Sequence, residues 1–211
     1  MDMRRIDISM PLFPGMPRFP GDPEVAVTAV RSVERGDPYS LSSLALGSHT
    51  GTHIDPPSHF QPGALSADRV DPEVLNGECV VVDVDPRATE IGPEEVARLD
   101  RLAERVLFRT ANSARWSRSL TFFSDYVGLT VPAAEALVER GARLVGIDAL
   151  SIENDASDTF PVHQTLLSHG VVVLEGLLLA DAPAGTYALE CLPVRLRDGD
   201  GAPARAYLGT R

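Results

Sequence analysis

The sequence contains no lysine, and all 19 of its basic residues are arginine. Without a lysine amine, the protein can form neither the Schiff bases of pyridoxal-phosphate chemistry nor the lysine contact of a phosphate-binding P-loop. The G-x-S-x-G, G-x-G-x-x-G and C-x-x-C motifs are also absent. Several common enzyme classes are thereby excluded.

Cysteine, basic runs and long apolar runs are scarce. Cys79 and Cys191 are the only cysteines and form no metal-type pair, which favours a reduced, cytoplasmic protein. A net charge of -11 without a basic run argues against a nucleic-acid or anionic membrane surface. The longest apolar stretch, "VVVLEGLLLA", is too short to span a bilayer, and "MDMRRIDISM" lacks the apolar core of a signal peptide.

The chain predicts one domain. Its 211 residues, 44% of them hydrophobic, can bury one large core, and no repeat, low-complexity tract or linker divides them. We therefore predict a single domain over residues 1–211, with residues 1–23 forming a proline-rich extended arm.

Hydrophobic periodicity predicts an α/β fold. The predicted strands are 78–85, 105–110, 142–148, 171–179 and 186–196. The predicted helices are 92–106, 130–141 and 160–170. Strands and helices alternate in the second half, whereas the first half is strand and loop, which favours a mixed β-sheet with flanking helices. The segment "RDGDGAP" (197–203) lacks the later acidic ligand of a calcium loop, so we interpret it as a turn.

Three of the five histidines lie in "LGSHTGTHIDPPSHF", residues 46–60. The side chains of interest there are His49, His53, Asp55 and His59. A straight strand rises roughly 3.3 Å per residue and would hold His49 and His53 about 13 Å apart, whereas ligands of one zinc ion lie about 2.0–2.2 Å from it. Glycines and prolines oppose a helix and can bend the chain. We predict a bent loop that binds metal; the alternative is a surface loop with solvated histidines.

Two further candidates lie downstream. Glu175 stands in an apolar, strand-like run, where an unpaired carboxylate would cost several kcal/mol. A metal ion would relieve this cost; the alternative is a strand-end glutamate paired with an arginine. His163 lies in the first turn of a predicted helix and, taken alone, is interpreted more simply as a capping or core residue. His169 suits a helix C-terminus, and no site role is assigned to Asp83, Asp85 and Asp148.

The segment "SHTGTHIDPPSH" resembles the H-x-G-T-H-x-D-x-P-x-H signature of the cyclase-like metal-dependent hydrolases, a family that includes bacterial kynurenine formamidase and isatin hydrolase. The resemblance runs nearly end to end. It includes "DIS-PL-P---FPGDP", "LFRT", "LVGIDALSIEN", "FPVHQTLLSHGVVVLEGL" and "YALECLPVRL".

This resemblance implies a swivelling β/β/α fold, assembly as a homodimer or homotetramer, and two divalent metal ions per chain, usually Zn²⁺ and in some members Mn²⁺. Carried onto matching positions, the metal ligands would be His49, His53, Asp55, His163 and Glu175, with Asp55 and Glu175 bridging the ions. His59 would be the catalytic acid/base. Phe19 stands where kynurenine formamidases commonly have a tryptophan that contacts the substrate. An aromatic side chain is therefore kept at this position, while the identity of the substrate is left open.

Charge connects these residues to hydrolysis. Two divalent ions, offset by Asp55, Glu175 and a bound hydroxide, leave a net positive centre that lowers the pKa of water and stabilises an oxyanion. His59 would then protonate the departing amine. We predict hydrolysis of an amide in a small aromatic substrate, foremost N-formyl-L-kynurenine to L-kynurenine and formate. One alternative is a hydrolase of a cyclic amide or a lactone. The other is a non-catalytic metal-binding protein, but such a protein would not need His59.

Overall fold

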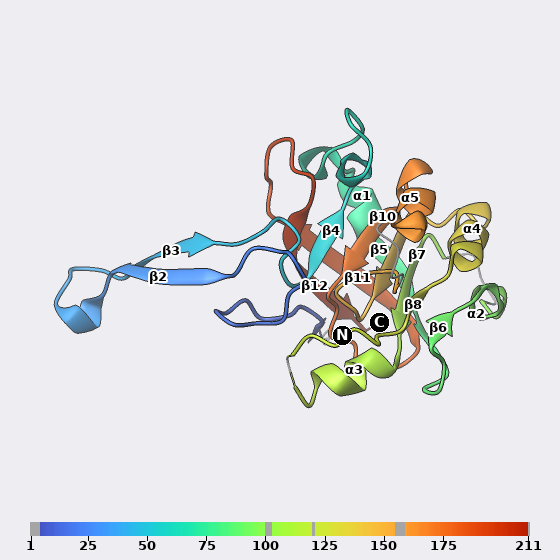
Figure 1. Cartoon of the computed structure of the whole chain (residues 1–211), viewed down its shortest axis with the longest axis horizontal. Coiled ribbons are helices and arrows are strands. Elements are labelled where there is room, and N and C mark those ends of the chain that lie inside the picture. Colours follow the sequence, from blue (N-terminus) through green and yellow to red (C-terminus); the bar gives the residue numbers. More distant parts are fainter. Residues whose placement is uncertain (1–4, 100–102, 120, 155–158, 211) are drawn as a thin grey trace.

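The computed structural model describes residues 5–99, 103–119, 121–154 and 159–210. Its main element is an eight-stranded sheet in the order β1-β12-β11-β5-β7-β9-β10-β4 (Figure 1). These strands are β1 (Arg5–Asp7), β4 (His53–Asp55), β5 (Asn76–Asp83), β7 (Arg105–Arg109), β9 (Leu144–Ile147), β10 (Val172–Glu175), β11 (Gly185–Pro193) and β12 (Ala202–Gly209). Because β12 also pairs with β4, the sheet closes into a barrel.

The sheet is mixed, as the sequence predicts. The pairings β5–β7, β7–β9 and β9–β10 are parallel, and the remaining pairings are antiparallel. The parallel strands are buried on both faces, which explains their almost continuous apolar sequences. In β7, Leu107 packs into one apolar cluster with Ile54 and Leu174, while Val106 and Phe108 join a second cluster beneath the helices.

Helices cover the outer face of these central strands (Figure 1). Helices α2 (Pro93–Ala97), α4 (Val131–Glu139) and α5 (Pro161–Ser168) form this cover, whereas α1 (Pro72–Leu75) and α3 (Ala111–Trp116) pack into other apolar clusters. Helix α4 begins after Thr130, whose hydroxyl accepts from the Ala133 amide, and is followed by Gly141 at φ 80°. Two short strands, β6 (Glu90–Ile91) and β8 (Gly128–Leu129), form a separate parallel pair.

Three predicted elements extend at least three residues past the end that the structure gives them. The predicted strand 171–179 ends at Glu175, because Gly176 turns the chain at φ 67°. The predicted strand 186–196 ends at Pro193. Of the predicted helix 92–106, residues 93–97 are helical and β7 already begins at Arg105; its apolar position Leu102 lies outside the described residues.

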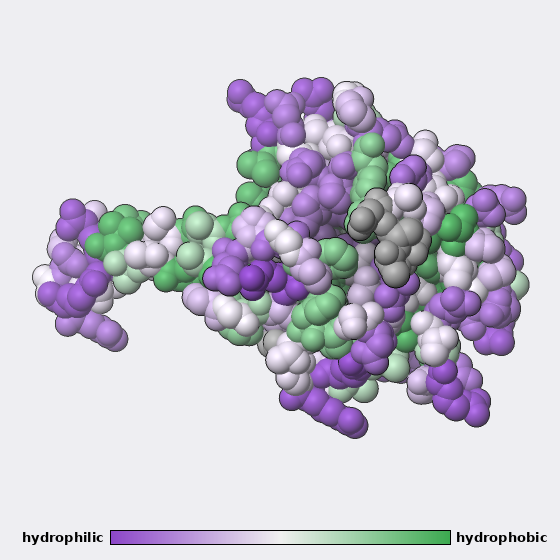
Figure 2. Space-filling view, viewed as in Figure 1, coloured by the Kyte–Doolittle hydropathy of each residue, from purple (hydrophilic) through white to green (hydrophobic). Residues whose placement is uncertain are grey.

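An antiparallel hairpin, β2 (Ala26–Arg31) and β3 (Leu41–Ala45), projects away from the barrel (Figures 1 and 2). We call it the hairpin arm. A 3₁₀ turn, Val33–Arg35, lies near its tip, and every strand residue of the arm is exposed. Within the preceding segment 1–23, residues 5–7 form an edge strand against β12, and no helix occurs among its described residues.

Among the described residues, no helix is long and apolar enough to cross a membrane.

Candidate active site

Strand register places three of the predicted ligands on one face of the sheet. β4 and β10 are antiparallel neighbours in which Glu175 pairs with His53 and Val173 with Asp55. Side chains alternate along a strand, so Ile54 points into the core while His53 and Asp55 point to the opposite face, together with Glu175. His53 Nε2 lies 3.3 Å from both Asp55 Oδ1 and Glu175 Oε2.

His49 reaches this face because the chain bends before β4, as predicted. Gly51 adopts φ 66°, which returns His49 toward the strand and brings its Nδ1 within 2.8 Å of Asp55 Oδ1. From the opposite side, Gly201 approaches the imidazole so closely that a Cβ there would lie 2.5 Å from His49 Cε1. Asp200 Oδ2 lies 3.7 Å from His49 Nε2. The 197–203 segment is a turn, as expected, but it also supports the site.

His163 enters from α5. Its Nε2 lies 3.1 Å from Glu175 Oε1 and 3.6 Å from Asp55 Oδ2. The simpler capping or core interpretation of this histidine therefore does not describe its surroundings. The alternative for Glu175, pairing with an arginine, is also wrong, since its side-chain partners among the described residues are His53, His163 and the Ile152 amide.

Glu153 is a residue of this site that the sequence analysis missed. One of its oxygens lies 2.5 Å from His163 Nδ1, and its carboxylate also accepts from the Val162 and His163 amides. A carboxylate bonded to one imidazole nitrogen leaves the other nitrogen free to act as a ligand. The available signal was a glutamate directly after the apolar Ile152, in the segment that follows β9.

His59 lies in a 3₁₀ turn, Pro57–His59, that follows β4. Its ring stacks on that of His49 with the centroids 4.0 Å apart. Ligating atoms of His59, His49 and Asp55 all lie within 4.8 Å of one another. The geometry thus places His59 at the cluster, where it can act either as a proton carrier or as a ligand.

Electrostatics inside the cluster favour a cation. Burial opposes the protonation of His53, yet the charges of Asp55 and Glu175 outweigh it and hold the pKa of His53 well above its usual value. Burial likewise opposes protonation of His163, and its bonds to Glu153 and Glu175 nevertheless raise its pKa to about 10. Burial lowers the pKa of His59. A negative electrostatic field that stabilises protonated imidazoles also favours a bound metal cation in place of those protons.

Two orphaned atoms support the same conclusion. His49 Nε2 and Asp55 Oδ2 are buried without a hydrogen-bond partner among the described residues. Leaving a buried polar atom unsatisfied costs about 1–3 kcal/mol, and more if it is charged. Imidazole and carboxylate are the donors that zinc and manganese accept, so this residue set fits divalent metal ions.

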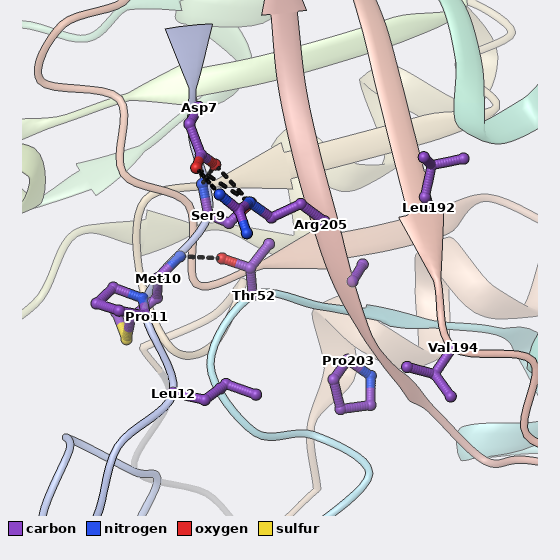
Figure 3. Close-up of a pocket in the computed structure, with 11 residues that line it drawn as sticks. Asp7, Ser9, Met10, Pro11, Leu12, Thr52, Leu192, Val194, Pro203 and Arg205 are labelled. Atoms are coloured by element: carbon purple, nitrogen blue, oxygen red, sulfur yellow. Dashed lines mark hydrogen bonds and ion pairs between the residues drawn. The ribbon is translucent and has the colours of Figure 1, made fainter. Parts of the chain in front are cut away.

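A cavity of about 340 Å³ opens onto the cluster. Beyond the ligating residues, it is lined by Phe19, Asp22, Phe60, Leu150, Ser151 and Phe160. Phe19 thus lies in the wall, where the resemblance predicts an aromatic platform. A separate groove of about 470 Å³, shown in Figure 3, contains none of the cluster residues, and its charged side chains, Asp7 and Arg205, bind each other.

The remaining singled-out residues lie outside the cluster. Asp83 pairs with Arg109, and Asp85 with Arg87. Asp148 is buried and accepts from the Thr110 and Ser113 side chains, which anchors the start of α3. His169 lies at the C-terminal end of α5, where its Nδ1 is 2.8 Å from the Thr165 carbonyl oxygen, as its sequence position suggests.

Comparisons with known proteins agree on one family. The model of the family described as "Putative cyclase" matches residues 6–154. A kynurenine formamidase from Erythrobacter litoralis is 35% identical over 206 residues, which cover 97% of this chain and 94% of that protein. A kynurenine formamidase from Salinibacter ruber is 38% identical over 208 residues, which cover 98% and 97%.

Solved structures extend the likeness to the fold. A structure from Bacillus stearothermophilus, described as that of a "predicted metal-dependent hydrolase", is 32% identical with a TM-score of 0.86, and the match covers 100% of both chains. Isatin hydrolase A from Labrenzia aggregata, bound to benzyl benzoate, is 25% identical with a TM-score of 0.83 and covers 99% of this chain and 94% of that one.

Proposed function

The chain belongs to the Cyclase family, and from that premise we propose that it is a metal-dependent amidohydrolase that converts N-formyl-L-kynurenine to L-kynurenine and formate. The observation that carries this proposal is the convergence of four histidines and Glu175 on the wall of an aromatic cavity, with Asp55 buried beside them. Two kynurenine formamidases aligned over nearly the whole chain support the choice of substrate.

The proposed ligands of two divalent metal ions are His49, His53, Asp55, His163 and Glu175. Asp55 and Glu175 are suited to bridging because each lies near more than one of the histidines. We propose Zn²⁺, with Mn²⁺ as the alternative, since both accept this mixture of nitrogen and oxygen donors. When bound, such ions lower the pKa of water and polarise a carbonyl oxygen.

The chain itself supplies the proton and the orientation. His59 stands beside the ligands with a pKa lowered by burial, so its imidazole can accept a proton and then deliver it to the departing amine nitrogen. Glu153 fixes the ring orientation and tautomer of His163. Phe19, Phe60 and Phe160 offer apolar surface to an aryl ring and exclude water from it.

Steady-state rates test this function. Protein loaded with zinc or manganese should hydrolyse N-formyl-L-kynurenine faster than isatin or simple lactones, and chelation should abolish turnover. A clean, active, metal-free preparation would contradict metal dependence. Preference for isatin or a lactone would favour the second candidate, a cyclic amide or lactone hydrolase, which the isatin hydrolase neighbour supports. Metal binding without turnover would indicate a non-catalytic metal-binding protein.

We also propose that the chain assembles as a homodimer or homotetramer. Its hairpin arm carries exposed apolar side chains, among them Val27 opposite Leu44, and a lone two-stranded hairpin is marginally stable in water. A second copy of the chain that packs against the arm would bury these side chains and stabilise the hairpin. Sedimentation equilibrium should show that the parent protein is an oligomer. The double variant Val27→Asp, Leu44→Asp should be dissociated, whereas the control Leu65→Asp, at an exposed leucine outside the arm, should stay assembled. A monomeric parent protein would contradict the proposal.

Two further proposals concern the domain organisation and the cellular location of the protein. The barrel takes its strands from residues 5 to 209, which supports a single domain over residues 1–211 with 1–23 as its extended arm. One cooperative unfolding transition tests this. Cys79 and Cys191 are buried free thiols, which supports a cytoplasmic location. Cell fractionation that finds the protein elsewhere would contradict it.

A further inference from the structure

A tight turn places an aromatic ring and a carboxylate side by side in the cavity wall. In the sequence "FPGD" the Asp22 amide donates to the Phe19 carbonyl oxygen at 3.1 Å, and Gly21 adopts φ 100°. Proline second and a positive-φ glycine third are the residues a type II turn requires. Such a turn brings its first and fourth residues close together, and here both of them line the cavity.

The Asp22 carboxylate has no bonding partner in the part of the chain that the structure describes. None of the described residues forms a hydrogen bond or ion pair with its side chain, although it is half-buried. The nearby Arg18 is already engaged: its Nε donates to the Asp22 backbone carbonyl and its Nη2 to Glu24, each at 3.0 Å. The loop therefore uses its arginine to brace the turn, and Asp22, a residue of the cavity wall, forms no ion pair with it.

The cavity is lined by no other charged side chain among the described residues, apart from the ligand cluster. Its remaining lining residues are aromatic or apolar, apart from Ser151, and no arginine is among them. Burial raises the pKa of Asp22, and the charges of His49 and His53 lower it in part. A half-buried carboxylate that forms no ion pair with the described residues is a costly arrangement, which a cationic group on the substrate would relieve.

We propose that Asp22 binds the ammonium group of an amino-acid substrate while Phe19 contacts its aryl ring. This inference rests on the proposed function and names its specificity determinant. N-formyl-L-kynurenine carries an α-ammonium at the end of its side chain, whereas isatin and simple aryl formamides carry none. Asp22 would thus select amino-acid formamides over neutral ones, and the substrate carboxylate, which finds no cation in the cavity, would face water.

The test compares two formamides that differ at the amino-acid end. N-formyl-L-kynurenine has the ammonium, and 2'-formamidoacetophenone keeps the ring, ketone and formamide without it. Asp22→Asn should raise KM for N-formyl-L-kynurenine about five- to tenfold, in line with one charge-assisted hydrogen bond. It should leave kcat and metal content nearly unchanged, and change both constants for the neutral formamide by less than about twofold.

Two further variants sharpen the result. Asp22→Glu keeps the charge and should recover part of the lost affinity. Glu24→Gln removes an exposed charge from the same loop, outside the cavity, and should preserve the preference for the cationic substrate. An unchanged KM in Asp22→Asn, or an equal loss on both formamides, would overturn the ammonium site while the formamidase function stands. Absence of turnover on either formamide in the parent protein would overturn the proposed function, and this inference with it.

Discussion

The floor and the rim of the cavity are built in different ways. The floor consists of His53, Glu175 and His163, with Asp55 buried directly beneath them, and their exposed fractions are 2%, 3%, 4% and 1%. The rim consists of Phe19, Asp22 and His59, which are half-buried and lie on turns. The floor is positioned by strand pairing and a helix, whereas the rim is positioned by local turns and ring contacts.

This difference separates two tasks. Buried groups held by a sheet keep their geometry, which a shared metal site needs because ligand distances tolerate little error. Turn-borne groups can vary without disturbing the core, and in the proposed function Phe19 and Asp22 would contact the part of the substrate that differs between related reactions. Floor substitutions should therefore change metal content and stability, and rim substitutions should change kinetic constants alone.

Glu175→Ala should have the largest effect. It removes a buried charge from among His53 and His163, so metal occupancy and activity should fall toward those of the metal-free protein, and Tm should fall as well. Metal analysis and thermal unfolding measure this. Glu190→Ala, a strand glutamate paired with exposed Arg5, is the matched control and should keep its metal. Full metal occupancy in the Glu175→Ala variant would contradict the assignment of Glu175 as a metal ligand in the floor.

His59→Ala should come next, with kcat reduced by about 10²–10⁴, the usual contribution of a positioned proton carrier. Occupancy and Tm should stay near those of the parent, and the deficit should shrink for amides with better leaving groups. His169→Ala, outside the cavity, serves as the control. If His59→Ala instead empties the site while turnover per bound metal stays normal, His59 is a ligand and belongs to the floor.

Glu153→Gln should lower metal affinity or activity about 10- to 100-fold, as expected for a carboxylate that orients a ligating histidine. The substitution keeps the side chain's size but weakens its bonds to His163 and to two backbone amides. Isothermal titration of the metal-depleted variant with zinc measures the affinity. An affinity equal to that of the parent would show that packing alone orients His163.

Phe19→Ala should have the smallest effect, a rise in KM for aryl substrates of about several-fold with metal content intact. Contact with the ring is shared by the ground state and the transition state, so kcat should change little. Phe19→Trp keeps the aromatic face and should retain a KM near that of the parent. If KM is unchanged in Phe19→Ala, Phe19 does not contact the substrate, and its assignment to the rim is wrong.

Local sequence signals predicted much of the fold. Continuous apolar runs gave the central strands because parallel strands are buried on both faces, and Gly141 and Gly170 marked helix ends because each adopts a positive φ. The strand through Glu175 was drawn too long, since an apolar run does not reveal where Gly176 bends the chain. Closure of the barrel by β12 and β4 also escaped prediction, because pairing between distant strands leaves no local pattern.

The sequence by itself determined which groups gather around the site. The spacing of His49, His53 and Asp55, with glycine between them and prolines after them, requires a bend and supplies the donors. Tertiary structure alone decided that Glu175 lies across from His53, that Glu153 holds His163, and that Gly201 presses on His49. Those contacts join segments far apart in the chain, and only the register of paired strands and the packing of α5 bring them within bonding distance.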